Sequence, residues 1–140
     1  MKKTVLLPTL ALALASCAPT VQQDPVYSKS QTYTGTCAEA LAQLDAVAIR
    51  TRPAVLFGVN SWTPLKQTSK GENGAAYVST NGTSVVSYGV VTPIGGTVTV
   101  VANCSQAGDK ATITLSSSGQ QQNYINTLND ALLKGITLPQ

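Results

Sequence analysis

The chain has 140 residues, with nine Lys or Arg, six Asp or Glu, three cysteines and no histidine. The lack of histidine removes the usual general base and the commonest side-chain metal ligand, and no two acidic residues have the spacing of a catalytic carboxylate pair. We therefore expect no enzyme, no metal site and no cofactor. The length suits a single domain.

The N-terminus has the pattern of an export signal. Lys2 and Lys3 precede an apolar run over residues 5–15, which is shorter than a membrane-spanning helix. The run ends in Leu14-Ala15-Ser16-Cys17. An aliphatic residue and two small residues before a cysteine resemble the lipobox of bacterial lipoproteins.

This resemblance implies that residues 1–16 are a removed signal peptide and that the mature chain begins at Cys17, with lipid on its sulfur and palmitate among the acyl chains. Position 18 is not aspartate, which implies an outer-membrane location in hosts that sort lipoproteins as enterobacteria do. Two alternatives are a membrane-spanning helix, which Pro8 disfavours, and ordinary cleavage that releases a soluble chain starting at Ser16.

After the signal peptide, residues 17–31 are predicted to form the lipidated N-terminus and a flexible tether, because they carry prolines and polar residues without apolar periodicity. Residues 32–140 are predicted to form one domain. Removal of Lys2 and Lys3 leaves seven basic against six acidic residues, so nucleic acid is not an expected partner. The membrane is an expected partner because of the lipid at Cys17.

The first part of the domain is predicted to contain a short strand over residues 31–34 and then a helix. Thr36 and Glu39 have the spacing of a capping box, and Pro53 prevents the helix from continuing far past Arg52. A further apolar run covers residues 54–59. A strand over 61–68 is expected to be bent or to lie at a sheet edge, because it contains Pro64.

A series of hairpins is predicted next, because segments rich in Val, Thr and Ile alternate with turn residues. The predicted strands are residues 75–80, 83–92, 97–104 and 110–117. Asn81-Gly82 is the clearest two-residue turn. A second helix is predicted from a capping box at Ser118 to Gly135, followed by a short exposed or packed tail.

Cys37 and Cys104 are predicted to form a disulfide. Cys37 shares a helical stripe with Leu41 and Leu44, and Cys104 falls on the apolar face of the strand over 97–104. A bond between them would fix the first helix onto the sheet, as expected in an oxidising compartment. The alternative is two buried free thiols.

These elements predict an α+β fold: an antiparallel four- to five-stranded meander sheet with two helices on one face, in the order (β)αββββ(β)α. The order over residues 31–135 resembles that of small helix-grip-like envelope lipoproteins. No motif is shared, so the resemblance concerns the fold alone.

The predicted function is a lipid-anchored, non-enzymatic envelope protein that binds a protein or another cell-envelope component. The alternative is a carrier that holds a small apolar ligand between sheet and helices. Trp62, Tyr77 and Tyr88 are the candidate partner or ligand contacts, with a core or rim position as the alternative for Trp62.

The lipobox gives a direct prediction for Cys17→Ser. Loss of the acylated sulfur should move the protein from the membrane to the soluble fraction, while its circular dichroism stays unchanged. Cell fractionation checks this. Retention in the membrane would contradict the anchor, and release in an unfolded form would contradict the division between tether and domain.

Overall fold

The computed structural model describes residues 26–53, 62–82, 84–93, 95–119 and 122–140. The predicted signal peptide, Cys17 and the apolar run over residues 54–59 lie outside these residues.

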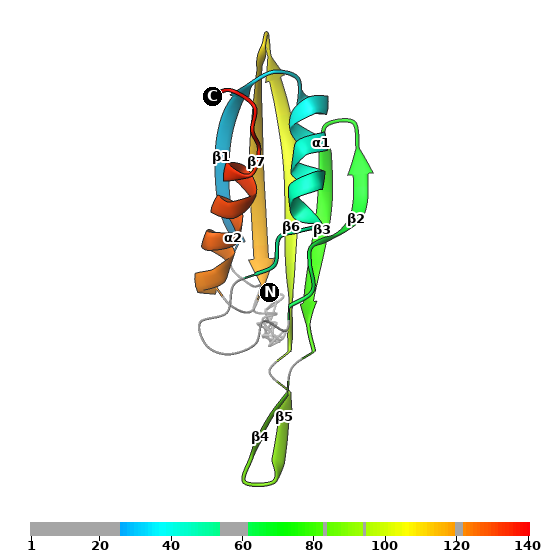
Figure 1. Ribbon diagram of the computed structural model, residues 1–140, viewed down its shortest axis with the longest axis vertical. Coiled ribbons are helices and arrows are strands. Elements are labelled where there is room, and N and C mark those ends of the chain that lie inside the picture. Colours follow the sequence, from blue (N-terminus) through cyan, green and yellow to red (C-terminus); the bar gives the residue numbers. More distant parts are fainter. Residues whose placement is uncertain (1–25, 54–61, 83, 94, 120–121) are drawn as a thin grey trace, which may run out of the picture.

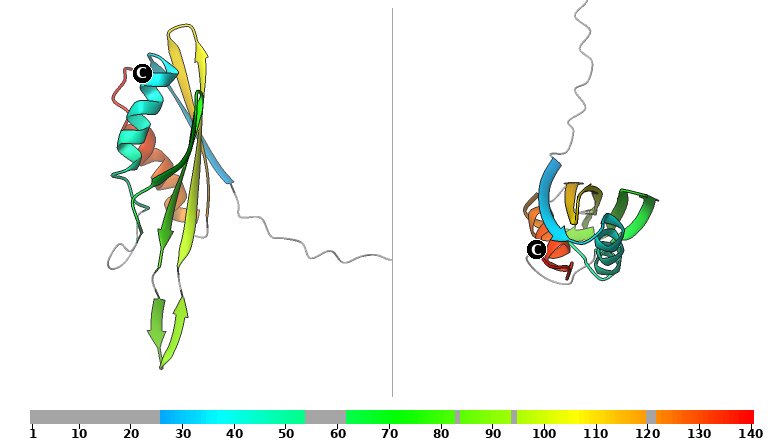
Figure 2. Two further views of the ribbon diagram at one scale, coloured as in Figure 1. Left: turned by 90° about the vertical axis from the view of Figure 1, so that its right-hand side faces the viewer. Right: turned by 90° about the horizontal axis from the view of Figure 1, so that it is seen from above.

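The described residues form nine elements: β1 (Val26–Thr34), α1 (Cys37–Ala48), β2 (Lys66–Gly71), β3 (Gly74–Asn81), β4 (Ser84–Ser87), β5 (Val90–Pro93), β6 (Gly96–Ala107), β7 (Lys110–Gly119) and α2 (Gln122–Lys134) (Figure 1). Five strands make an antiparallel sheet in the order β1-β7-β6-β3-β2, and β4 pairs with β5. Both helices lie on the same face of the sheet (Figure 2). The predicted α+β fold is confirmed.

Strands β6 and β7 form the centre of the sheet, and their sequences alternate as predicted. The inner residues that face the helices are buried: Val98, Val100, Ala102, Cys104, Ala111, Ile113 and Leu115. The strands pair with Ala102 opposite Leu115 and Cys104 opposite Ile113, which places these apolar side chains on one face. Their alternating pattern therefore determines the register of the sheet's centre.

Strand β1 is longer than predicted, because it begins at Val26 and not at residue 31. Residues 26–31, which we assigned to the tether, pair with β7 along the sheet edge. On the outer face the strands are linked by side-chain hydroxyls, with Thr32 Oγ1 2.8 Å from Thr112 Oγ1. This pairing depends on polar residues, so the sequence shows no apolar alternation there.

Strand β1 is also tied to α2. The Tyr33 hydroxyl donates to the Leu133 carbonyl oxygen at 2.6 Å, and burial raises the pKa of this phenol to about 12. Lys29 forms an ion pair with Asp130 of α2, and its hydrogen bond lowers the pKa of that carboxyl. These contacts hold the edge strand and the last helix together.

Helix α1 begins at the predicted capping box. Thr36 Oγ1 accepts from the Glu39 amide, and the Glu39 carboxylate accepts from the Thr36 amide. The Thr36 amide and hydroxyl both donate to the Glu39 carboxylate and thereby lower its pKa. The helix ends at Ala48, before Arg52, because the Thr51 amide and hydroxyl bond back to the carbonyl oxygens of the last turn.

Helix α2 begins at Gln122, and the predicted capping box at Ser118 is wrong. Ser118 lies inside β7, where it pairs with Thr99 of β6 and Val26 of β1. Hydrogen bonding on both sides keeps this residue in the strand. The helix ends just before Gly135, as predicted, and a Cβ on Gly135 would lie 2.6 Å from the Val47 Cγ1 atom of α1.

Strand β2 forms the second edge of the sheet, as predicted for the strand near Pro64, but it begins only at Lys66. Its pairing with β3 is irregular between Gln67 and Ser69, and all its residues are exposed. Trp62, which precedes the strand, makes a single bridge with Asn81 of β3. The predicted strand over residues 61–68 therefore consists of a bridge followed by a shifted strand.

The structure contains the predicted disulfide between Cys37 and Cys104, which closes a separation of 67 residues. Replacing both cysteines by alanine should lower the free energy of unfolding by up to about 4 kcal/mol, because the unfolded chain regains its freedom. Urea unfolding with and without reductant measures this. Equal stability of the two proteins would contradict the expectation, and reductant should not affect the double variant.

Candidate functional site

The hairpin of β4 and β5 differs from its prediction. Asn81 pairs with Gly96 and is the last residue of β3, so Asn81-Gly82 is not a hairpin turn. The turn lies at Tyr88 and Gly89, whose φ angles are 51° and 78°. Two positive φ angles match the right-handed twist of a two-residue hairpin. The predicted single strand over residues 83–92 is therefore wrong.

Little in the sequence indicated this turn, because a bulky residue rarely adopts a positive φ and Tyr88 stands between valine-rich segments. Gly89 was the one local signal. An aromatic residue at the turn itself is thus a feature that only the structure reveals.

The hairpin carries three exposed apolar side chains. Val86, Tyr88 and Val90 are 67%, 104% and 62% exposed. Val86 lies opposite Val91 and Val90 opposite Ser87, so the two valines point to opposite faces of the hairpin. Figure 1 shows β4 and β5 as an arm that projects beyond the end of the five-stranded sheet.

Charge differs between the two ends of the domain. The sequence contains no Asp, Glu, Lys or Arg from residue 73 to residue 108, a segment that includes the whole hairpin. At the opposite end of the sheet, the turns between β2 and β3 and between β6 and β7 carry Glu72 and Asp109, and β7 begins at Lys110. The projecting hairpin is therefore uncharged.

The three candidate contact residues do not come together. Trp62 and Tyr77 are each 1% exposed and belong to the hydrophobic core, whereas Tyr88 is at the hairpin tip. Their burial agrees with the alternative of a core position for Trp62. Tyr88 is the member of the set that is available to a partner.

A polar cluster around Asp45 was not predicted. The Asp45 carboxylate accepts from the Tyr77 hydroxyl, from Gln67 Nε2 at 2.9 Å and from Lys70 Nζ at 2.6 Å. Burial first, and then the contact with Asp45, raise the pKa of Tyr77. The cluster joins α1 to β2 and β3. Its members are distant in sequence, so local spacing gave no signal.

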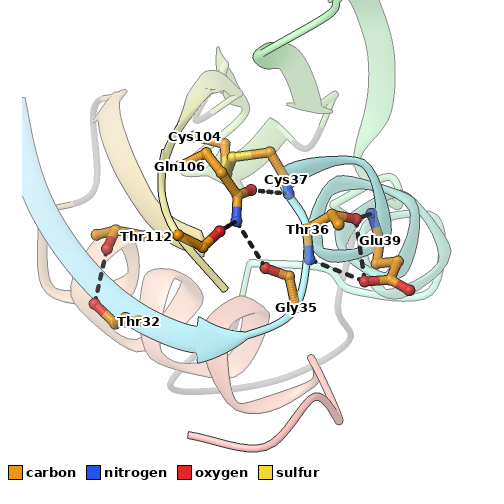
Figure 3. Close-up of a disulfide and its surroundings, with 9 residues drawn as sticks. Thr32, Gly35, Thr36, Cys37, Glu39, Cys104, Gln106 and Thr112 are labelled. Atoms are coloured by element: carbon orange, nitrogen blue, oxygen red, sulfur yellow. Dashed lines mark hydrogen bonds between the residues drawn. A yellow bond between two sulfur atoms is a disulfide. The ribbon is translucent and has the colours of Figure 1, made fainter. Parts of the chain in front are cut away.

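Hydrogen bonds from Gln106 reinforce the attachment of α1 to β6 beside the disulfide (Figure 3). Gln106 Oε1 accepts from the Cys37 amide at 2.7 Å, and its Nε2 donates to the carbonyl oxygens of Gly35 and Gly108 at 3.0 and 2.9 Å. The sulfur-bearing residues are buried. One side chain of β6 thus fixes the chain just before α1, and the disulfide fixes its first residue.

The outer face of the sheet has a hollow of about 240 Å³ where β2, β3 and β6 meet. Small residues create it: Gly71, Gly74 and Ala76 lie beside Val101 and Asn103. The charged side chains of the Asp45 cluster do not line it. Its lining residues are all uncharged.

The described part of the chain contains neither a metal-binding cluster nor a membrane-spanning helix. No group of three or more His, Cys, Asp or Glu side chains in it could hold a metal ion. None of its helices has the length and apolar character needed to cross a membrane.

Comparison with solved structures supports the helix-grip arrangement. A conserved protein from Geobacillus kaustophilus superposes with a TM-score of 0.52 at 11% identity, covering 80% of this chain and 92% of that one. A hypothetical protein from Helicobacter pylori gives a TM-score of 0.47 at 9% identity, covering 97% and 96%. The likeness is one of fold alone. No protein-family model and no curated protein matches the sequence.

The buried Tyr77 gives a pH prediction. Its pKa in the folded state is raised above the ordinary value of 10.0, so its contribution to stability is complete below that pH and is lost as pH rises through the folded-state pKa. Tyr77→Phe should therefore weaken the fall in stability above about pH 10. Asp45→Asn should weaken it less, because burial remains. Urea midpoints across this range measure the effect, and identical pH profiles for all three proteins would contradict it.

Proposed function

We propose that this protein is a lipid-anchored, non-enzymatic binding module of the bacterial cell envelope. In this proposal Cys17 holds the chain at the membrane, facing the periplasm or the cell surface, and the β4–β5 hairpin is the contact with another envelope component. The observation that carries the proposal is the exposure of Val86, Tyr88 and Val90 on one projecting arm.

Export is supported by two independent features. The lipobox at residues 14–17 is a sequence signal, and the bond between Cys37 and Cys104 suits an oxidising compartment. Assigning Cys17 to the lipid leaves the other two cysteines as a pair. The anchor and the disulfide thus account for all three cysteines.

A contact role for the hairpin is supported by its apolar surface. Three large apolar side chains exposed on one short hairpin differ from the scattered single apolar residues that are normal on a protein surface. Aromatic residues at the centre of a contact often supply much of its binding energy. Tyr88, fully exposed at the tip, is in the position for such a role.

The carrier hypothesis receives less support. Trp62 and Tyr77, its proposed lining residues, are packed into the core. The hydroxyl of Tyr77 is also engaged by Asp45. A ligand between sheet and helices would have to displace these contacts.

Photocrosslinking tests the proposal. The full-length protein would carry a photoreactive phenylalanine in place of Tyr88 and, as a matched control, in place of Asp109 at the turn between β6 and β7. We expect crosslinked adducts in the native envelope from the Tyr88 position and few from the Asp109 position. Equal yields from the two tips, or no adduct at Tyr88, would contradict a contact role for the hairpin.

A further inference from the structure

We infer that the β4–β5 hairpin docks on the same bilayer surface that holds the lipid anchor, with Tyr88 and its flanking valines entering the membrane interface. This inference rests on the proposed function and names the partner of the hairpin. Four features of the chain support it: the position of the N-terminal strand, the length of the preceding segment, the charge distribution and the orientation of the valines.

The tether and the hairpin leave the domain at the same end. Val26, the first described residue, pairs with Ser118, which in turn pairs with Thr99 of β6. Thr99 lies three residues after Gly96, where the strand begins beyond the hairpin. The chain that leads back to Cys17 therefore emerges beside the base of the arm, and the charged turns are at the other end.

The lengths of the two segments also fit. The nine residues from 17 to 25 can span at most about 30 Å when fully extended. The seven steps from Asn81 to Tyr88 extend the arm by roughly 23 Å beyond the sheet. Val26 lies roughly 10 Å farther from the tip than Asn81 does, because Val26 is level with Thr99 and Asn81 pairs with Gly96. The reach of the tether is therefore about equal to the distance from Val26 to the tip, and an extended tether with a tilted arm brings Tyr88 to the bilayer that holds Cys17.

The composition of the arm favours lipid over protein. Insertion of a charged side chain into a bilayer is costly, and residues 73–108 contain no charge at all. Tyrosine is enriched at membrane interfaces, because its ring is apolar and its hydroxyl remains hydrated. Val86 and Val90 point to opposite faces of the hairpin. A flat protein surface would cover only one of them, whereas a membrane interface surrounds both.

Docking would give the protein a second point of attachment. The acyl chains at Cys17 would hold the protein at the membrane but leave the domain free to turn on its tether, and an apolar contact at the hairpin tip would restrict that freedom. A lipid at Cys17 with an inserted tip would also fix the orientation of the domain. The turns that carry Glu72 and Asp109 would then face away from the membrane.

Fluorescence quenching in vesicles tests the inference. Full-length lipidated protein with Tyr88→Trp would be reconstituted into phosphatidylethanolamine and phosphatidylglycerol vesicles, with or without bromine on the acyl chains. Asp109→Trp is the matched control at the opposite turn. Trp62 is buried and is present in both variants. Its emission is measured in the protein without either substitution and subtracted.

We expect brominated lipid to remove roughly half or more of the emission added by Tyr88→Trp, as for a side chain at the boundary of headgroups and acyl chains. Asp109→Trp should lose none. Because the arm is uncharged, quenching should not change with salt or with the phosphatidylglycerol fraction. Adding Val86→Ser and Val90→Ser should abolish it, with the disulfide and the circular dichroism unchanged.

The outcomes separate this inference from the proposed function. Mass spectrometry of Cys17 and retention in vesicles report on the anchor. An unmodified Cys17, or loss of the protein from the vesicles, would overturn both the proposed function and membrane docking. A retained, folded protein without quenching would overturn membrane docking alone, as would equal quenching at both tips or quenching that requires anionic lipid. Tyr88 crosslinks only to a protein, or to a second copy of this chain, would also overturn it and leave the binding role in place.

Discussion

The attachment of α1 to β6 is the constraint on which the rest of the domain depends. The disulfide from Cys37 to Cys104 fixes the start of the helix at one point of the sheet. The Gln106 side chain supports it by hydrogen bonds to the backbone of Gly35 and Cys37. From there α1 can run only along the inner face. Its apolar stripe then meets the core, and Asp45 reaches Tyr77. A helix of three turns gains its position from this fixed origin.

Features that depend on residues close together in the sequence were predicted correctly, whereas features that depend on contacts between distant parts of the chain were not. The start of α1 and the inward-facing residues of β6 and β7 depend on local caps and alternation, and both were predicted. The capping-box pattern at Ser118 failed, since two neighbouring strands hold that residue in the sheet. Asn81-Gly82 failed as a turn for the same reason. Among the candidate contacts, only Tyr88 proved accessible, because burial depends on the whole fold.

Both edges of the sheet carry a lysine that is paired with an acidic residue of a helix. Lys29 on β1 meets Asp130, and Lys70 on β2 meets Asp45. Charged residues and an irregular pairing, such as the shift near Gln67, discourage strands of separate molecules from joining edge to edge. This protection matters most for a protein concentrated on a surface. The β4–β5 hairpin has no charged residues to protect its edges, as expected if a binding partner covers its tip.

The pairing of β1 with β7 has a consequence for how the domain forms. The first strand of the fold finds its partner only in the last, nearly the whole length of the domain away. Such a distant contact forms slowly and not before the C-terminal part of the chain is present. In the proposed export, the leading segment would have no native partner while the chain crosses the membrane, so the polypeptide could stay unfolded until it has crossed. The sheet would then close in the compartment where the disulfide can form.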